Sequence, residues 1–285
     1  MTAATLPLAP DGAALNGSSG VVPAPRSAGF QATAGATALR TMRKFVRSPQ
    51  LFVVGTIQGA LFLLIFRYVF GGAIDTGPVP YVDFMVPGFV ATGVLFSGMN
   101  TAAGVAEDLE QGFFDRLRSL PVPRTALLAG RALGDTAMVA HGAAVTAAIG
   151  FLVGFRLHGS IGEGLLAFAL TVAFGFAFIW MFVCIGLAAG NAQAAQGMSM
   201  LVFPLTFVSS AYVPVDSMPG WMQPVAEHQP VTAMINAVRA LALGDPGLAG
   251  LGHSITYWVG LSLLWCAVIV AVFAPLAVAR YRRTA

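Results

Sequence analysis

Charge is the scarcest property of this chain. Only 9% of its 285 residues are Asp, Glu, Lys or Arg, while 57% are hydrophobic. Soluble domains carry about 25% charged residues, so the composition excludes an ordinary water-soluble protein. The single lysine, Lys44, follows an arginine. Because a phosphate-binding G-x-x-x-x-G-K-[ST] loop needs a Gly-Lys step, the chain holds no such loop.

Common catalytic and metal-binding patterns are also absent from the sequence. It contains neither H-E-x-x-H nor G-x-S-x-G, two frequent hydrolase signatures. Cys184 and Cys266 both fall inside apolar stretches, so they define no disulfide framework and no metal-ligand spacing. We therefore expect no catalytic site, no metal or cofactor bound to this chain, and no nucleic-acid partner.

Long apolar runs are what the chain does have. About 20 apolar residues cross a bilayer as a helix, and six stretches qualify: residues 51–70, 84–106, 136–155, 165–189, 198–213 and 255–279. The stretches 165–189 and 198–213 come from one uncharged run, which the polar turn GNAQAAQG at 190–197 divides. The sequence thus predicts an all-α membrane protein with six transmembrane helices.

The first 35 residues differ from the rest of the chain. They are rich in small residues and proline and have no periodicity, which is typical of a disordered tail. They lack the charged start, apolar core and cleavage site of a removable signal peptide. We expect one transmembrane domain to occupy residues 36–285.

The basic residues predict the orientation, because Lys and Arg gather in cytoplasmic loops. With the amino terminus inside, the inner segments hold twelve of the fifteen basic residues, and the outer side keeps only Arg67, Arg156 and Arg239. Both termini are therefore expected in the cytoplasm.

Carboxylates are missing from the interior of the predicted spans. Every Asp and Glu lies near or beyond a span end, whereas ion-coupled carriers place such groups deep within their helices. Energy for transport must then come from a partner, or the protein is passive.

The segment Ala38–Arg47 has two stripes at helical spacing. One is apolar, made of Leu39, Met42 and Val46, and the other is basic, made of Arg40, Arg43, Lys44 and Arg47. This pattern predicts a helix lying in the inner membrane interface. The alternative is that the charges only set the orientation of the first span.

The one dense run of mixed charge is EDLEQGFFDRLRSLPVPR, residues 107–124. Glu107, Asp108 and Glu110 are expected in the first turn of a cytoplasmic helix, where the helix dipole favours acids. An apolar stripe of Phe113, Phe114, Leu117 and Leu120 is suited to a partner's groove, and Pro121 and Pro123 end the helix. An ordinary solvated loop is the alternative.

Three ionisable residues mark the start of the third span. Arg131 and Asp135 are spaced i,i+4, which predicts an ion pair at the membrane surface. His141 lies deeper, and it is either a functional group or a histidine bonded to a neighbouring helix.

Residues 209–241 precede the last span. Four prolines interrupt any continuous helix there, Trp221 is typical of a headgroup anchor, and an apolar stripe follows: Met234, Ile235, Val238 and Leu241. We expect short re-entrant helices in the outer leaflet, with a plain external loop as the alternative. The candidates for an external gate are Pro214, Pro219, Trp221 and Pro230.

Two of these regions resemble the signatures of one family. EDLEQGFFDRLRSLPVPRTALLAGR and the later VPVDSMPGWMQPVAEHQPVTAMINAVRAL are similar to segments of ABC type-2 export permeases, particularly the daunorubicin-resistance-like branch of multidrug and lipid exporters. The resemblance extends over roughly residues 38–283.

The resemblance implies a subunit of the bacterial plasma membrane that pairs with a second copy or a sister permease. Two cytoplasmic ATPase subunits would dock on it and hold the Mg-ATP. The residues implied in coupling to the ATPase are Glu107, Glu110, Gly112, Phe113, Phe114, Asp115, Arg116, Leu117, Arg118, Leu120, Pro121 and Arg124. The candidates for lining the pathway, which ordinary helix packing also explains, are Phe89, Phe96, Met99, Asn100, Met200, Phe203 and Phe207.

The function that the resemblance implies is ATP-driven efflux of a hydrophobic or amphipathic molecule, such as an antibiotic, a lipid or a glycolipid. One alternative is export of a lipid-linked polysaccharide. Another is a membrane scaffold or enzyme that has no ATPase partner.

Overall fold

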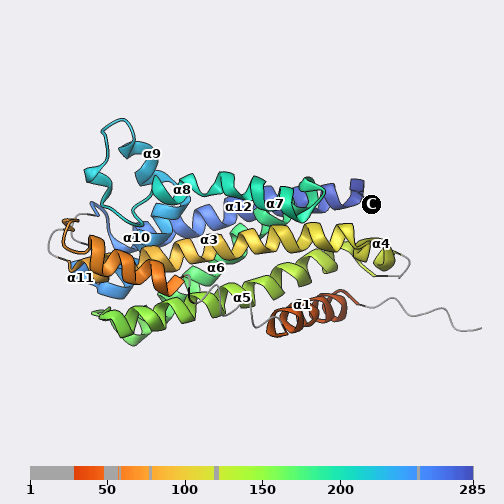
Figure 1. The fold of residues 1–285 in the computed structure, drawn as a ribbon, viewed down its shortest axis with the longest axis horizontal. Helices are drawn as coiled ribbons and strands as arrows, with labels where there is room; N and C mark the ends of the chain where they lie inside the picture. The colour runs from red at the N-terminus through yellow and green to blue at the C-terminus, as the bar shows by residue number, and fades with distance from the viewer. Residues whose placement is uncertain are drawn as a thin grey trace, which may run out of the picture.

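The computed structural model describes residues 29–47, 57, 59–76, 79–118, 122–248 and 251–284. All regular secondary structure in these ranges is helical. Four long helices run side by side along the bundle: α3 (Tyr81–Glu110), α5 (Arg124–Val153), α6 (Ile161–Ala189) and α12 (Ile255–Thr284) (Figure 1).

These four helices are long and apolar enough to cross a membrane. Each has 29 or 30 residues, or about 45 Å at 1.5 Å per residue, against a hydrocarbon core of about 30 Å. They contain the predicted spans 84–106, 165–189 and 255–279 and nearly all of 136–155, which are therefore confirmed as parts of long apolar helices.

α3 and α6 form the centre of the bundle. In their most apolar 18-residue windows, 78% and 61% of the residues are buried, whereas only 17% are buried in α5 and in α12. Small residues let the two central helices approach closely. A side chain at Gly98 of α3 would collide with the ring of Phe182, and one at Gly186 of α6 would collide with the backbone of Ala102.

The predicted fifth span is not one helix. The chain passes through α7 (Ala192–Ser199), the short η2 (Met200–Val202) and α8 (Pro204–Phe207), then turns. Pro204 has no backbone N–H to continue the earlier helix. The predicted polar turn 190–197 is also too long, because the Asn191 side chain accepts from Ala194 N at 2.7 Å and starts α7 at once. The prediction of a continuous helix over 198–213 was wrong.

The predicted first span lies partly outside the described residues, which omit 48–56 and 58. Its remainder is an apolar helix from Gly59 to Phe70, whose last turn is the π-helical η1 (Phe66–Phe70).

The region before the last span consists of short helices: η3 (Val215–Ser217), α9 (Gln223–His228), α10 (Pro230–Leu243) and α11 (Asp245–Leu248). Every residue of α10 after Pro230 is buried. Its 14 residues reach about 21 Å, too short for one crossing. Pro214 directly precedes η3, Pro230 opens α10, and Trp221 is 77% exposed in the turn before α9.

The amino-terminal helix α1 (Phe30–Val46) is longer than predicted. It begins eight residues before Ala38, so residues 30–35 belong to it and not to the predicted tail; residues 1–28 lie outside the described part. Its buried face is the small-residue set Thr33, Ala34, Thr37 and Thr41. This face packs on α5, where side chains at Gly130 and Gly134 would collide with it. The predicted apolar stripe Leu39, Met42 and Val46 is exposed.

The two ends of the bundle differ in what they carry. Figure 1 shows α1, α4 (Phe113–Arg118) and the carboxyl terminus toward one end, and α9, α10 and α11 at the other.

Candidate functional site

The corner between α3 and α4 is built from two helices and not one. α3 continues through Glu110, a two-residue turn follows, and α4 starts at Phe113. The turn depends on Gly112, whose φ of 60° lies in the left-handed region that glycine adopts readily at a helix end. The predicted single helix starting at Glu107 was therefore wrong.

The acidic residues before Gly112 therefore lie at the end of a helix and not at its start, so the helix dipole acts on them in the opposite sense. Glu107, Asp108 and Glu110 occupy the last turn of α3, where the negative end of the helix dipole disfavours carboxylates. Cations from other helices offset this effect. Lys44 of α1 contacts Glu107 at 3.1 Å, and both partners are about half exposed.

Asp108 makes two ion pairs at this corner. Its side chain is 2% exposed, with Oδ1 at 3.1 Å from Arg40 Nη2 of α1. Its Oδ2 lies 2.6 Å from Arg131 Nη1 of α5. Helices α1, α3 and α5 therefore meet at one buried carboxylate.

The predicted pair between Arg131 and Asp135 is confirmed. Arg131 Nε donates to Asp135 Oδ2 at 2.8 Å, and both side chains are buried. The guanidinium lies against α3 at Gly104, where any side chain would collide with it. Arg131 thus joins two carboxylates in one buried chain of charges.

The two aromatic rings of α4 pack within the chain. Phe114 is 4% exposed and meets Tyr281 of α12 with ring centroids 5.1 Å apart. The guanidinium of Arg40 lies 3.7 Å above the Phe113 ring. These rings, expected to enter a partner's groove, instead fasten α4 to α12 and α1.

The rest of the predicted coupling set is distributed around the corner. Arg116 is exposed and donates to Gln111 O at 3.0 Å. Arg124 begins α5. Leu120 and Pro121 lie outside the described residues. The remaining members fall within the α4 helix: Asp115, Leu117 and Arg118.

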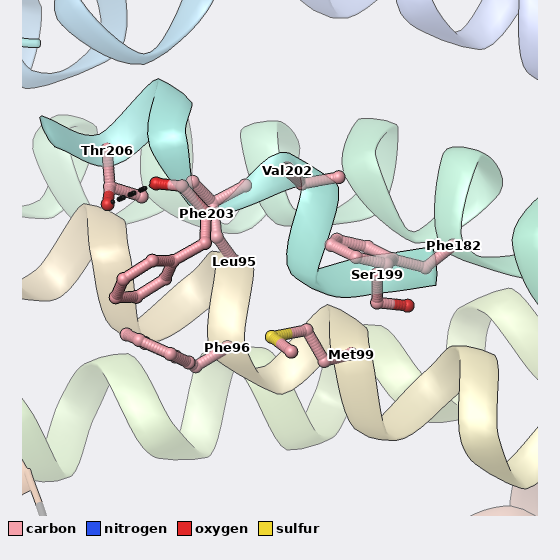
Figure 2. A pocket seen from close by; sticks show the side chains of 8 residues that line it. All are labelled: Leu95, Phe96, Met99, Phe182, Ser199, Val202, Phe203 and Thr206. Carbon is pink, nitrogen blue, oxygen red and sulfur yellow. Dashed lines mark hydrogen bonds between the residues drawn. The ribbon is translucent and has the colours of Figure 1, made fainter. Parts of the chain in front are cut away.

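A second feature is a small apolar pocket between α3, α6 and the broken segment α7–η2–α8. Figure 2 shows its lining, which is Leu95, Phe96, Met99, Phe182, Ser199, Val202, Phe203 and Thr206. Of the predicted pathway residues, Phe96, Met99 and Phe203 line it. Met200 and Asn100 are exposed outside it.

An aromatic ladder extends from this pocket. Phe96 contacts Phe203 at 5.2 Å between ring centroids, and Phe203 contacts Phe207 at 5.0 Å. Phe207 contacts Tyr212 at 5.4 Å, and Tyr212 meets Phe89 at 5.5 Å. Phe66 touches both Tyr212 and Phe89. Phe66, Tyr212 and Phe182 were not predicted, because aromatic residues in apolar runs carry no signal of which neighbours they face.

At the opposite end of the bundle, Arg239 is buried inside α10. Its Nη2 donates to Ser210 O at 2.9 Å and to Phe84 O at 3.0 Å, and its guanidinium lies 3.8 Å above the Phe84 ring. The sequence placed Arg239 only on the outer side. Its role in joining α10, α3 and the turn after α8 was missed.

His141 is exposed on α5, with its ring centroid 6.4 Å from that of Phe45 of α1. This contact accords with a histidine placed against a neighbouring helix.

Comparison with known proteins identifies the family. Residues 34–243 match the ABC-2 type transporter family. The chain is 35% identical to the daunorubicin resistance ABC transporter permease protein DrrB1 of Streptomyces coeruleorubidus, over 85% of this chain and 83% of that protein. It is 29% identical to the probable doxorubicin resistance ABC transporter permease protein DrrC of Mycobacterium tuberculosis, over 83% and 87%. It is 28% identical to the inner membrane transport permease YadH of Escherichia coli K12, over 72% and 79%.

The matched family segment includes the charged corner, the pocket and the whole of α10. The chain therefore belongs to the ABC-2 type transporter family and is a membrane permease subunit of that family.

Proposed function

We propose that this permease exports hydrophobic or amphipathic small molecules, driven by two copies of a cytoplasmic ABC ATPase that dock on α4. The observation that carries the proposal is the attachment of α4 to three helices. It follows α3 across Gly112, Phe114 packs on Tyr281 of α12, and Phe113 lies beneath Arg40 of α1. A displacement of α4 is thereby passed to the bundle.

The mechanism requires that the ATPase bind α4 differently in its two nucleotide states, since only differential contacts shift a conformational equilibrium. Arg116 is an exposed cation of α4 and is the residue proposed to contact such a partner. Phe114 would act by keeping α4 attached to α12. The other proposed coupling residues surround these two: Glu107, Glu110, Gly112, Phe113, Asp115, Leu117, Arg118, Leu120, Pro121 and Arg124.

The cargo proposed for the pathway is a drug-like molecule with a planar aromatic part. Two relatives carry daunorubicin or doxorubicin resistance in their names. The pocket and its ladder offer ring faces and edges, with which aromatic molecules interact favourably. Phe207 is 54% exposed on the ladder. The proposed lining remains Phe89, Phe96, Met99, Asn100, Met200, Phe203 and Phe207.

The proposed membrane arrangement has six crossings in the bacterial plasma membrane, with both termini in the cytoplasm. The helix ending at Phe70 would complete the first crossing, and α7–η2–α8 would form an interrupted fifth one. The basic helix α1 would lie at the inner interface, while α9 and α10 would re-enter from outside. Pro214, Pro219, Trp221 and Pro230 border these outer helices and are the proposed gate.

Pairing with a second copy or with a sister permease is part of the proposal. No feature of the described residues favours a lipid-linked polysaccharide over a smaller cargo. The alternative of a scaffold without an ATPase is disfavoured by relatives that are named as ABC transporter permeases.

Co-purification with the ATPase tests the docking site. In Arg116→Glu, an exposed charge of α4 is reversed, and we expect the ATPase to be lost while the permease remains in the membrane. Arg283→Glu is the control, because Arg283 is equally an exposed arginine, in α12. Retention of stoichiometric ATPase and normal drug efflux in Arg116→Glu would contradict the proposal.

A further inference from the structure

We propose that Asp108 is a positioning residue. When the ATPase displaces α4, Asp108 makes α1 and α5 move with it, acting through Arg40 and Arg131. This inference rests on the proposed function, because it assumes that the ATPase acts on α4. It adds a route by which the motion leaves α4, and it assigns a mechanical role to α1.

The first support is the burial and the charge balance of Asp108 and the charged side chains around it. Asp108 contacts Arg40 and Arg131, and Arg131 also contacts Asp135. The two cations and two anions balance. Asp108, Arg131 and Asp135 are buried, and Arg40 is partly exposed. Removing one of these charges leaves a buried partner uncompensated, which is strongly unfavourable. The helices that supply these groups therefore keep their contacts when one of them moves.

The second support is that Arg40 and Arg131 belong to one packed unit. α1 approaches α5 at Gly130 and Gly134, where even a methyl group would collide with Ala34 or Thr41. Such close backbone approach at small residues gives extensive van der Waals contact. Asp108 thus holds a tightly packed pair of helices by both of its members.

The third support is the position of Asp108 close to the start of α4. It lies in the last turn of α3, five residues before α4 begins at Phe113. The same Arg40 that binds Asp108 also covers the Phe113 ring. One guanidinium therefore contacts the end of α3 and the start of α4 together.

The neighbouring pair provides a matched control within the chain. Lys44 lies one helical turn after Arg40 on α1 and binds Glu107, the residue before Asp108. This pair is about half exposed, and exposed ion pairs contribute little. Arg40→Gln should therefore disturb the coupling, whereas Lys44→Gln should not.

The test measures motion at the far end of α5 and needs no cargo. Spin labels are attached at Leu152→Cys of α5 and Val225→Cys of α9, since both positions are well exposed. Pulsed electron paramagnetic resonance then measures the distance between the two labels. The buried Cys184 and Cys266 are first replaced by alanine. The permease is purified with its ATPase, and distances are compared without nucleotide and with ATP and vanadate.

Nucleotide is expected to add a second distance population in the parent protein and in Lys44→Gln. Coupling between sites typically amounts to about 5- to 150-fold. We expect Arg40→Gln and Asp108→Asn to lower the ratio of the second population to the first by about tenfold, with the ATPase still bound. If Asp108→Asn fails to accumulate, Arg40→Gln decides alone, because Arg40 is partly exposed.

Several results would overturn the inference. One is a ratio of the two distance populations in Arg40→Gln that equals the ratio in the parent protein. A second is a fall of this ratio in Lys44→Gln as large as the fall in Arg40→Gln. Another is the absence of any nucleotide response in a parent complex that retains the ATPase. Loss of the ATPase in Arg40→Gln would place Arg40 in the docking surface instead. Failure of the proposed function is seen separately, as a parent permease that binds no ATPase.

Discussion

Phe114 of α4 packs against Tyr281 of α12, with ring centroids 5.1 Å apart and planes at 68°. Edge-to-face pairs of this kind contribute about 0.5–1.5 kcal/mol beyond their burial. The contact joins the short helix α4 to the last long helix, α12, and both rings are almost fully buried.

Replacing Phe114 by alanine should therefore loosen α4 without unfolding the bundle. We expect drug transport to fall about tenfold or more, which corresponds to about 1.4 kcal/mol, while membrane insertion is retained. Transport in reconstituted vesicles and permease yield are the measurements. Phe30→Ala, at a half-exposed ring near the start of α1, is the control, and equal transport in the two variants would contradict the account.

The contact between α3 and α6 depends on the absence of a side chain at Gly98. A methyl group there would overlap the ring of Phe182, and forced overpacking typically costs about 1–3 kcal/mol. We expect Gly98→Ala to lower the thermal stability of the purified permease.

Gly93 provides the control in the same helix. Its nearest neighbour would be 3.9 Å from an added methyl group, so Gly93→Ala should gain the ordinary helix preference of alanine. A Gly98→Ala protein as stable as Gly93→Ala would show that the two central helices are not packed as described.

The buried guanidinium of Arg239 should stabilise the end of the bundle that lies away from α4. Arg239→Met removes the donor to Ser210 O and Phe84 O, and an unsatisfied buried acceptor costs about 1–3 kcal/mol. We expect faster proteolysis of the segment between α8 and α10. Arg156→Met is the comparison, because Arg156 is an exposed arginine that also donates to a backbone carbonyl, Phe151 O at 2.8 Å. Similar proteolysis in both variants would argue against the role of Arg239.

The aromatic ladder predicts a specific effect on cargo affinity. Phe203 connects the pocket to Phe207. For the proposed planar aromatic cargo, with doxorubicin as the probe, Phe203→Ala should raise the KM by about five- to tenfold, or about 1–1.4 kcal/mol. The KM for a non-aromatic amphipathic cargo should change less. Leu201→Ala is the control, since Leu201 is 78% exposed and does not line the pocket. Equal changes for both cargoes would remove the case for an aromatic pathway.

The long helices were predictable because each is a run of apolar residues longer than a bilayer needs. Arg131 and Asp135 were also predictable, since an i,i+4 pair is local in sequence. Arg40 and Asp108 are separated by 68 positions, and no sequence period relates them. Their ion pair follows from how α1 packs on α5 and how α5 packs on α3.

The errors of the sequence prediction occur where local signals compete. Three acids suggested a helix start, but Gly112 with positive φ ends α3 after them. Hydropathy alone favoured a continuous fifth span, but Asn191 starts α7 early and Pro204 interrupts the helix. Short-range capping and backbone chemistry decided these boundaries.

Photo-cross-linking from position 116 tests most directly whether the ATPase binds this permease at α4. A photoreactive amino acid in place of the exposed Arg116 should form a covalent adduct with the ATPase in native membranes. The same group in place of the exposed Trp221, in the turn directly before α9, should form none, because α9 lies at the other end of the bundle (Figure 1). An ATPase adduct from position 221, or an ATPase that co-purifies without any adduct from position 116, would contradict the account.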